Sequence, residues 1–177
     1  MLKELTTKFF VTLFLFSMIF SSANALEISA FKPEDDDEAT VTFCKTFKVE
    51  NVSVSKKSVI QTVVFEKDDG EYENIALLNS NIANKIISCF EGVCDLRTAC
   101  DKVPYTLISA RKAKSGDIVI AKVAFDRDLS AIFLISSYQK KDKTLYRVTM
   151  PQDLKFLSSK YKRNLRDWLI KETKNLL

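Results

Sequence analysis

Histidine is absent from this chain of 177 residues. Its absence excludes Ser-His-Asp and Cys-His nucleophilic catalysis, and it removes the most common metal ligand in proteins. Two carboxylates in different environments can still perform acid–base chemistry, but aspartates in turns are usually just solvated. We therefore expect no enzymatic activity, no catalytic residue, no cofactor and no metal. The dense carboxylates on which an enzyme would have to rely are Asp35, Asp36, Asp37, Asp68 and Asp69.

The chain also lacks an apolar run that could cross a membrane as a helix. Residues 9–20 are mostly apolar, but about 12 residues are too few to span a hydrocarbon core of ~30 Å. Lysines precede this run and Ala23-Asn24-Ala25 follows it, which is typical of a signal peptide and its cleavage site. No cysteine follows directly, so a lipid-modified N-terminus is not indicated. We expect residues 1–25 to be removed and the mature protein to be secreted or periplasmic, without a transmembrane span. The alternative is an uncleaved membrane anchor.

The four cysteines lack the two closely spaced C-x2-4-C pairs of a zinc site, because only Cys89 and Cys94 lie that close in sequence. An even number of cysteines in an exported chain favours disulfides over a zinc site or free buried thiols, and four cysteines allow three pairings. We expect Cys94 to pair with Cys100 and Cys44 to pair with Cys89.

The acidic run 34–38 lacks the glycine and the spaced ligands of a calcium-binding EF-hand, which indicates a solvated turn. Acidic residues outnumber basic ones from Leu26 to Phe90, and the reverse holds from Tyr138 to Leu177. The basic part could attract the acidic part, face an anionic partner, or simply be a solvated helix surface.

Apolar and polar residues alternate in several short segments, and each half of the mature chain ends in a helical pattern. A one-residue slip between Val49 and Val52 indicates a bulge. The first helix is expected to begin at Asn79-Ser80-Asn81 and end near Gly92, and the second to run from Pro151 to the end of the chain. Strands followed by a helix, twice over, indicate an α+β fold with an internal repeat. The expected strands are 26–30, 39–43, 47–54, 59–65, 118–125, 132–135 and 146–150.

Short motifs in the first half follow one another in the order and spacing of a known family. These motifs are Phe47-Lys48-Val49, Val52-Ser53-Val54, Asp69-Gly70-Glu71-Tyr72, Asn74-Ile75, Asn79-Ser80 and Lys85-Ile86. Residues 27–90 thereby resemble the bacterial SpoVG family (stage V sporulation protein G). The second half is similar more weakly, through the spacing of Phe133 and Tyr146 and through Val148-Thr149-Met150-Pro151.

The resemblance implies a non-enzymatic protein linked to septation, sporulation and nucleic-acid binding, built from units that dimerise. A unit of roughly 65 residues is marginally stable alone, so two fused copies could bury the face that such units bury on dimerising. We expect two SpoVG-like units, each a small antiparallel sheet followed by a C-terminal helix, packed as a pseudo-dimer within one chain. The expected segments are a signal peptide (1–25), a first unit (26–92), a cysteine-containing connector (93–104) and a second unit (105–177).

The resemblance also places a basic, phosphate-contacting loop in each unit. The loop of the first unit contains acidic residues, whereas the loop of the second keeps its basic character and is followed by a basic helix. We expect an exported binding or structural module with an unidentified protein or envelope partner; the alternative is a nucleic-acid-binding regulator. Because of export, we expect any nucleic-acid binding to be weak and non-specific. The candidate contact residues are Lys140, Lys141, Lys143, Arg147, Lys160, Lys162, Arg163 and Arg166.

Overall fold

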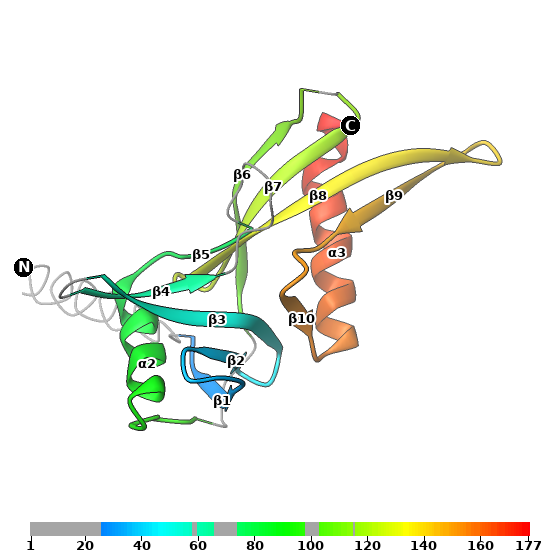
Figure 1. The fold of residues 1–177 in the computed structure, drawn as a ribbon. Coiled ribbons are helices and arrows are strands. Elements are labelled where there is room, and N and C mark those ends of the chain that lie inside the picture. The colour runs from blue at the N-terminus through cyan, green and yellow to red at the C-terminus, as the bar shows by residue number, and fades with distance from the viewer. Residues whose placement is uncertain (1–25, 58–59, 66–73, 98–102, 115) are drawn as a thin grey trace, which may run out of the picture.

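The computed structural model describes residues 26–57, 60–65, 74–97, 103–114 and 116–177. They form two five-stranded antiparallel sheets and two α-helices, which confirms the expected α+β class (Figure 1). The predicted loop aspartates Asp68 and Asp69, and the connector cysteine Cys100, lie outside the described residues. Among the residues described, no helix is both long and apolar enough to cross a membrane.

The elements follow the same order in both halves of the chain. The first half contains β1 (Ile28–Pro33), β2 (Glu38–Phe43), β3 (Phe47–Lys57), β4 (Ile60–Phe65), β5 (Ile75–Leu77) and α2 (Ser80–Phe90). The second contains β6 (Tyr105–Lys112), β7 (Ile118–Phe125), β8 (Leu129–Lys140), β9 (Lys143–Thr149), β10 (Leu154–Phe156) and α3 (Ser159–Thr173), with a short 3-10 helix, Lys174–Leu176, at the end.

Each half gives its short fifth strand to the sheet of the other half. Sheet A consists of β1, β2, β3 and β4 with β10 added to β3, and sheet B consists of β6, β7, β8 and β9 with β5 added to β8. Leu154 of β10 lies opposite Val49, and Ile75 of β5 lies opposite Ala131. The two sheets are therefore joined by main-chain hydrogen bonds in both directions.

Strands β3 and β8 are each long enough to pair with two strands along one edge, in addition to β2 or β7 along the other. The first part of each strand pairs with the strand from the other half, and the second part forms a hairpin with β4 or β9. In β3 the two parts meet at an irregularity in the pairing with β2, where Asn51 has a positive φ of 56°. The predicted slip between Val49 and Val52 is thus confirmed as a bulge, which increases the local twist of the strand. Figure 1 shows the β8–β9 hairpin reaching well beyond the rest of sheet B.

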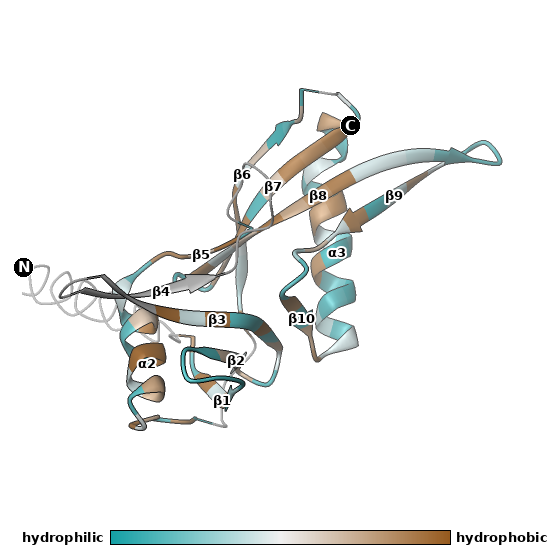
Figure 2. Cartoon of the chain, in the orientation of Figure 1, coloured by the Kyte–Doolittle hydropathy of each residue, from teal (hydrophilic) through white to brown (hydrophobic). Residues whose placement is uncertain are grey.

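Buried apolar residues from both sheets and both helices form a continuous core. Helix α2 packs on sheet A, where the ring of Phe90 contacts Phe31 of β1 at 5.0 Å between centroids. Helix α3 packs on sheet B, where Tyr105 of β6 contacts both Tyr161 and Trp168. Figure 2 shows the apolar stripe of α2 and the mostly polar outer surface of α3. An amphipathic face of each helix is stabilised by burial against its sheet.

The two helices begin at side-chain caps, as helix N-termini commonly do. The side chain of Asn79 accepts hydrogen bonds from the backbone N–H groups of Asn81 and Ile82, so the predicted start of α2 is confirmed. The prediction of a helix from Pro151 onward was wrong for its first residues, because Leu154 to Phe156 pair with β3 and α3 begins only after Ser158. Leu157, which directly precedes the cap of α3, is 52% exposed.

The structure joins Cys89 to Cys94, so both predicted cysteine pairings were wrong. The reason is the end of helix α2. Gly92 adopts a positive φ of 81° and donates its N–H to the carbonyl of Cys89, while the N–H of Val93 bonds to the carbonyl of Ser88. This is the hydrogen-bond pattern of a glycine-terminated helix, which reverses the chain within a few residues. The reversal brings Cys94 back to the last turn of the helix.

Candidate functional site

The register of sheet B separates its side chains into two faces. Cross-strand partners point to the same face, and successive residues of a strand alternate between faces. Phe133 and Ile135 of β8 are buried, as are their neighbours Ala121 and Val119 of β7, on the face that α3 covers. We call this the inner face of sheet B.

No described helix packs on the other face, which we call the open face of sheet B. It carries an apolar strip that includes Leu134 and Tyr138, which are 39% and 50% exposed. Basic side chains lie on both sides of this strip. The residues that the register places on the open face include Arg111, Ile120, Lys122, Ile132, Leu134, Tyr138, Lys140, Lys143, Leu145 and Arg147.

Four basic side chains of the open face have no carboxylate partner among the described residues. Lys122, Lys140, Lys143 and Arg147 form no ion pair within the part of the chain that the structure describes. Lys140 and Lys143 lie directly opposite each other at the end of the β8–β9 hairpin. Like charges in such a position repel each other, so an anion bound there would relieve an unfavourable interaction.

The corresponding face of sheet A has a different character. There the carboxylate of Glu50 lies 2.6 Å from the ammonium of Lys48 and 3.9 Å from that of Lys155. The three residues come from β3 and from the exchanged strand β10. On this part of sheet A two lysines share the carboxylate of Glu50, whereas the four lysine and arginine side chains named above on sheet B share none within the described residues.

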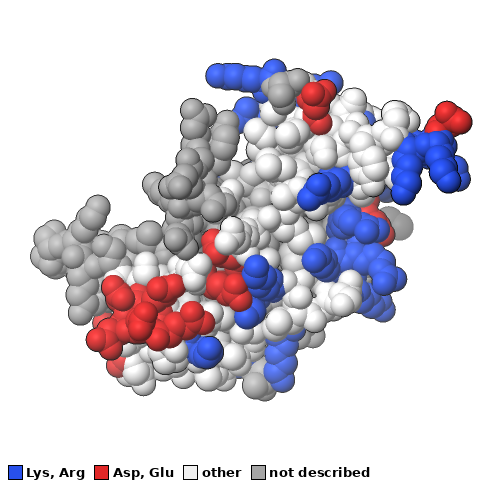
Figure 3. All heavy atoms as spheres, turned by 45° about the vertical axis from the view of Figure 1, so that its right-hand side comes forward, with Lys and Arg blue, Asp and Glu red and all other residues white. Residues whose placement is uncertain are grey.

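The structure brings together part of the predicted contact residues. Lys140, Lys143 and Arg147 share the open face, and Lys141 lies in the turn between β8 and β9, where its φ is 49°. The helical residues Lys160, Lys162, Arg163 and Arg166 are exposed on α3, which packs against the inner face; Arg166 also pairs with Asp167 at 2.8 Å. Figure 3 shows basic side chains at the hairpin tip and a second basic group below it.

Sequence reasoning missed Lys122 and the apolar strip of the open face. The reason is that β7 and β8 carry apolar residues on both faces, so the alternation that would separate a buried face from an exposed one is weak. A lysine within the apolar run Ile118–Phe125 was the available signal, because a central lysine points to solvent.

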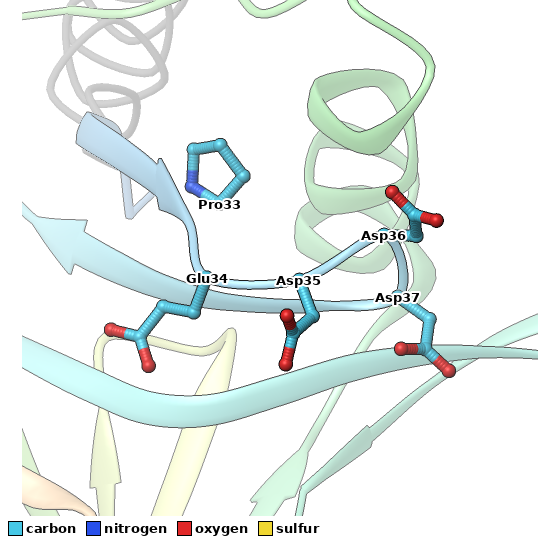
Figure 4. A pocket seen from close by; sticks show the side chains of 5 residues that line it. All are labelled: Pro33, Glu34, Asp35, Asp36 and Asp37. Carbon is cyan, nitrogen blue, oxygen red and sulfur yellow. The ribbon is translucent and has the colours of Figure 1, made fainter.

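Figure 3 shows a dense group of acidic side chains away from the basic group at the hairpin tip, and single acidic side chains beside basic ones elsewhere. Residues 33–37 line a surface hollow at the β1–β2 turn, and there the side chain of Asp36 points away from those of Glu34, Asp35 and Asp37 (Figure 4). Glu34 is held by the hydroxyl of Thr40 at 2.8 Å and approached by Lys32 at 3.8 Å. Within the described residues, no group of three or more cysteine or acidic side chains could hold a metal ion.

No family model, curated protein or solved structure matches the chain.

Proposed function

We propose that the chain is an exported, non-enzymatic binding module that holds an anionic partner on the open face of sheet B. The observation that carries the proposal is the set of basic side chains without acidic partners around an exposed apolar strip. A solvated surface would place its charges in mixed, mutually compensating positions, as sheet A does around Glu50. An unpaired basic face attracts polyanions and orients them before contact.

The envelope of the cell offers polymers of the required chemistry, which carry phosphate or carboxylate groups along an extended chain. Such a polymer could lie along β8 and β9, where Lys140, Lys143 and Arg147 would contact its charges. The proposed export of the mature chain favours this partner. It also agrees with the septation role that the SpoVG resemblance implies.

Single-stranded nucleic acid is the second candidate, and one residue favours it. Tyr138 is half exposed next to Lys140 and Leu145, and an exposed aromatic ring beside basic residues is a stacking platform for bases. Stacking of this kind tolerates many sequences, so the binding would be non-specific. This candidate requires contact with nucleic acid outside the cell or retention inside it.

We further infer that the two halves are copies of one SpoVG-like unit packed as a pseudo-dimer. Reciprocal hydrogen bonds support this inference. The N–H of Ile132 bonds to the carbonyl of Asn74, and the N–H of Glu50 bonds to that of Asp153. At the other end of these two short strands, the N–H of Leu78 bonds to the carbonyl of Asp128, and the N–H of Leu157 bonds to the carbonyl of Thr46. Equivalent positions of the two halves thus make equivalent bonds to the other half.

The proposal is tested by reversing charge on one side of sheet B. The triple variant Lys140→Glu, Lys143→Glu, Arg147→Glu should bind polyphosphate and single-stranded oligothymidylate at least about tenfold more weakly than the parent. For the oligonucleotide, its log–log salt slope should become less negative by about 2, because roughly 0.7 counterions are released per neutralised phosphate. Fluorescence anisotropy over a salt series measures both quantities.

A matched control carries the same change of charge on α3, as Lys160→Glu, Lys162→Glu, Arg163→Glu. Equal weakening in both triple variants would contradict the proposal, since net charge alone would then account for binding. Tyr138→Ala separates the two partners: it should weaken oligothymidylate binding by about 1–3 kcal/mol and leave polyphosphate binding nearly unchanged if bases stack on the ring.

A further inference from the structure

The backbone nitrogen of Leu26 lies in a buried contact that joins the two halves. Its N–H donates to Oδ2 of Asp128 at 2.7 Å, and Leu26 and Asp128 are only 1% and 4% exposed. Asp128 ends the turn between β7 and β8. Its other carboxylate oxygen accepts from the amide of Asn79, the cap of α2, which also donates to the carbonyl of Arg127 at 3.0 Å.

The same nitrogen is the one that the predicted processing step would release. The Ala23-Asn24-Ala25 pattern places the cleaved bond between Ala25 and Leu26. In the hydrolysis, water adds to the Ala25 carbonyl, the C–N bond breaks, Ala25 keeps a carboxylate, and Leu26 leaves with an amino group. Near neutral pH this amino group binds a proton, because an α-amino group ordinarily has a pKa of about 7.7–8.0.

We propose that signal-peptide cleavage converts the Leu26 N–H into an ammonium that forms a buried ion pair with Asp128 and locks the two halves together. This inference rests on the proposed export of the chain. Hydrogen bonds between charged groups are roughly twice as strong as neutral ones. Cleavage thus strengthens a contact that already exists in the fold, and it does so only for a chain cut at this bond.

The charges around the site favour an added cation. Asp126, in the same turn, has a buried Oδ2 without a hydrogen-bond partner in the described part of the chain. Burial raises the pKa of Asp126, and the charge of Asp128 raises it further, while Arg127 opposes both effects. Nearby, Glu27 is already paired with Lys85 at 2.7 Å. The turn therefore carries two carboxylates, of Asp126 and Asp128, and the single positive charge of Arg127. An ammonium at Leu26 would offer three N–H donors to this turn, whereas the backbone amide offers one.

The test compares the chain that begins at Leu26 with a free amine and the same chain acetylated at that amine. We expect the free-amine form to have an equilibrium constant for folding about tenfold larger at pH 6.5, the difference expected when a neutral hydrogen bond becomes a charged one. Pairing with Asp128 raises the folded-state pKa of the amine above its unfolded value. The advantage should therefore be complete below about pH 7.7 and disappear as the pH rises through the folded-state pKa.

Two further measurements keep the result unambiguous. In Asp128→Asn the free and acetylated forms should be equally stable, whereas the exposed-site control Asp167→Asn should keep the difference. If Asp128→Asn does not fold, the α-amino pKa of parent protein labelled at Leu26 is measured by NMR, and a value above 8 supports the ion pair. Equal stability of the two parent forms from pH 6 to 9, or an amine pKa at or below the ordinary range, overturns the proposal.

Intact mass of the chain recovered from its host tests the processing step separately. A chain that begins at Leu26 supports cleavage, and a chain that keeps residues 1–25 overturns the cleavage and, with it, the lock. If the host chain begins at Leu26 but acetylation changes nothing, the lock fails while the proposed export stands.

Discussion

Tyr161 shows how a single atom can oppose the packing of its own side chain. Its ring stacks with Phe156 of β10 at 5.8 Å and meets Tyr105 of β6 edge-on at 5.6 Å, so the ring contributes to the contacts of α3 with both sheets. Its hydroxyl, however, is buried without a hydrogen-bond partner in the described part of the chain. A buried hydroxyl without a partner costs about 1–3 kcal/mol relative to its hydrated state.

We therefore expect Tyr161→Phe to raise the free energy of unfolding by about 1 kcal/mol near neutral pH. Burial, and then the neighbouring Tyr105, raise the pKa of Tyr161 well above its ordinary value of 10.0. The folded protein thus holds its phenolic proton more tightly than the unfolded chain does. The stability that this provides is complete below about pH 10 and is lost as the pH rises from there toward the folded-state pKa.

Urea unfolding between pH 8 and 11.5 measures both effects. The parent should lose stability above pH 10 more steeply than Tyr161→Phe, which retains only the contribution of other tyrosines such as Tyr105. The control Tyr138→Phe changes a half-exposed ring and should stay within about 0.5 kcal/mol of the parent. A destabilised Tyr161→Phe would show that the hydroxyl has a partner.

At the scale of elements, the sequence is informative wherever a local rule decides the structure. The alternation of Ala39, Val41 and Phe43 predicts β2, and Asn79 predicts the start of α2, because strand faces and helix caps depend on neighbouring residues. Strand β10 was missed for the opposite reason. Leu154 and Leu157 have helical spacing, and the strand exists only because β3, a hundred residues earlier, offers it an edge to pair with.

The candidate site was predictable in part for the same reason. The basic residues of the β8–β9 turn stand out in the sequence, and the hairpin itself is local. Which face of sheet B stays open depends on which face α3 covers. That choice is made by tertiary packing and cannot be read from the sequence of the hairpin. Only the register of β8 and β9 shows which of the candidate basic residues share the open face.

The cysteines give a prediction at this scale. Cys44 is also disulfide-bonded, and since Cys89 and Cys94 pair with each other, we expect the partner of Cys44 to be the fourth cysteine of the sequence, Cys100. Peptide mapping of the non-reduced protein should therefore give one linked pair within a single stretch, Cys89–Cys94, and one long-range pair, Cys44–Cys100. The Cys44–Cys100 disulfide closes a much longer loop than Cys89–Cys94 does. Its removal should therefore cost more, about 2–5 kcal/mol of unfolding free energy.

The control is the variant with Cys89 and Cys94 both replaced by serine, which removes the short loop and leaves the long one intact. Its cost should be smaller than that of replacing Cys44 and Cys100 together. Recovery of a Cys44–Cys89 or Cys94–Cys100 peptide would contradict the arrangement at the end of α2.

At the scale of the whole molecule, the exchange of β5 and β10 makes each half depend on the other. Sheet A lacks its fifth strand without β10, and sheet B lacks its fifth strand without β5. Strand β5 of sheet B leads directly into α2, which packs on sheet A, and β10 of sheet A leads directly into α3, which packs on sheet B. Loss of an exchanged strand from one sheet should therefore also detach a helix from the other sheet. Two such halves should unfold together, as single small domains do, and not one after the other.

We accordingly expect a destabilising substitution in one half to lower the unfolding midpoint of the other half as well. Ile82 of α2 is buried in the first half, and Ile82→Ala should cost about 2–5 kcal/mol through lost burial and the cavity that remains. Trp168 of α3 is the only tryptophan of the chain and reports on the second half. The midpoint of its fluorescence transition in urea should fall in Ile82→Ala by the same amount as the midpoint of the far-ultraviolet circular dichroism transition.

Val93→Ala, at a position 73% exposed beyond α2, should leave both midpoints near those of the parent. If Trp168 kept its parental midpoint while the circular dichroism signal split into two steps, the halves would be independent units and the exchanged strands would contribute little to joining them.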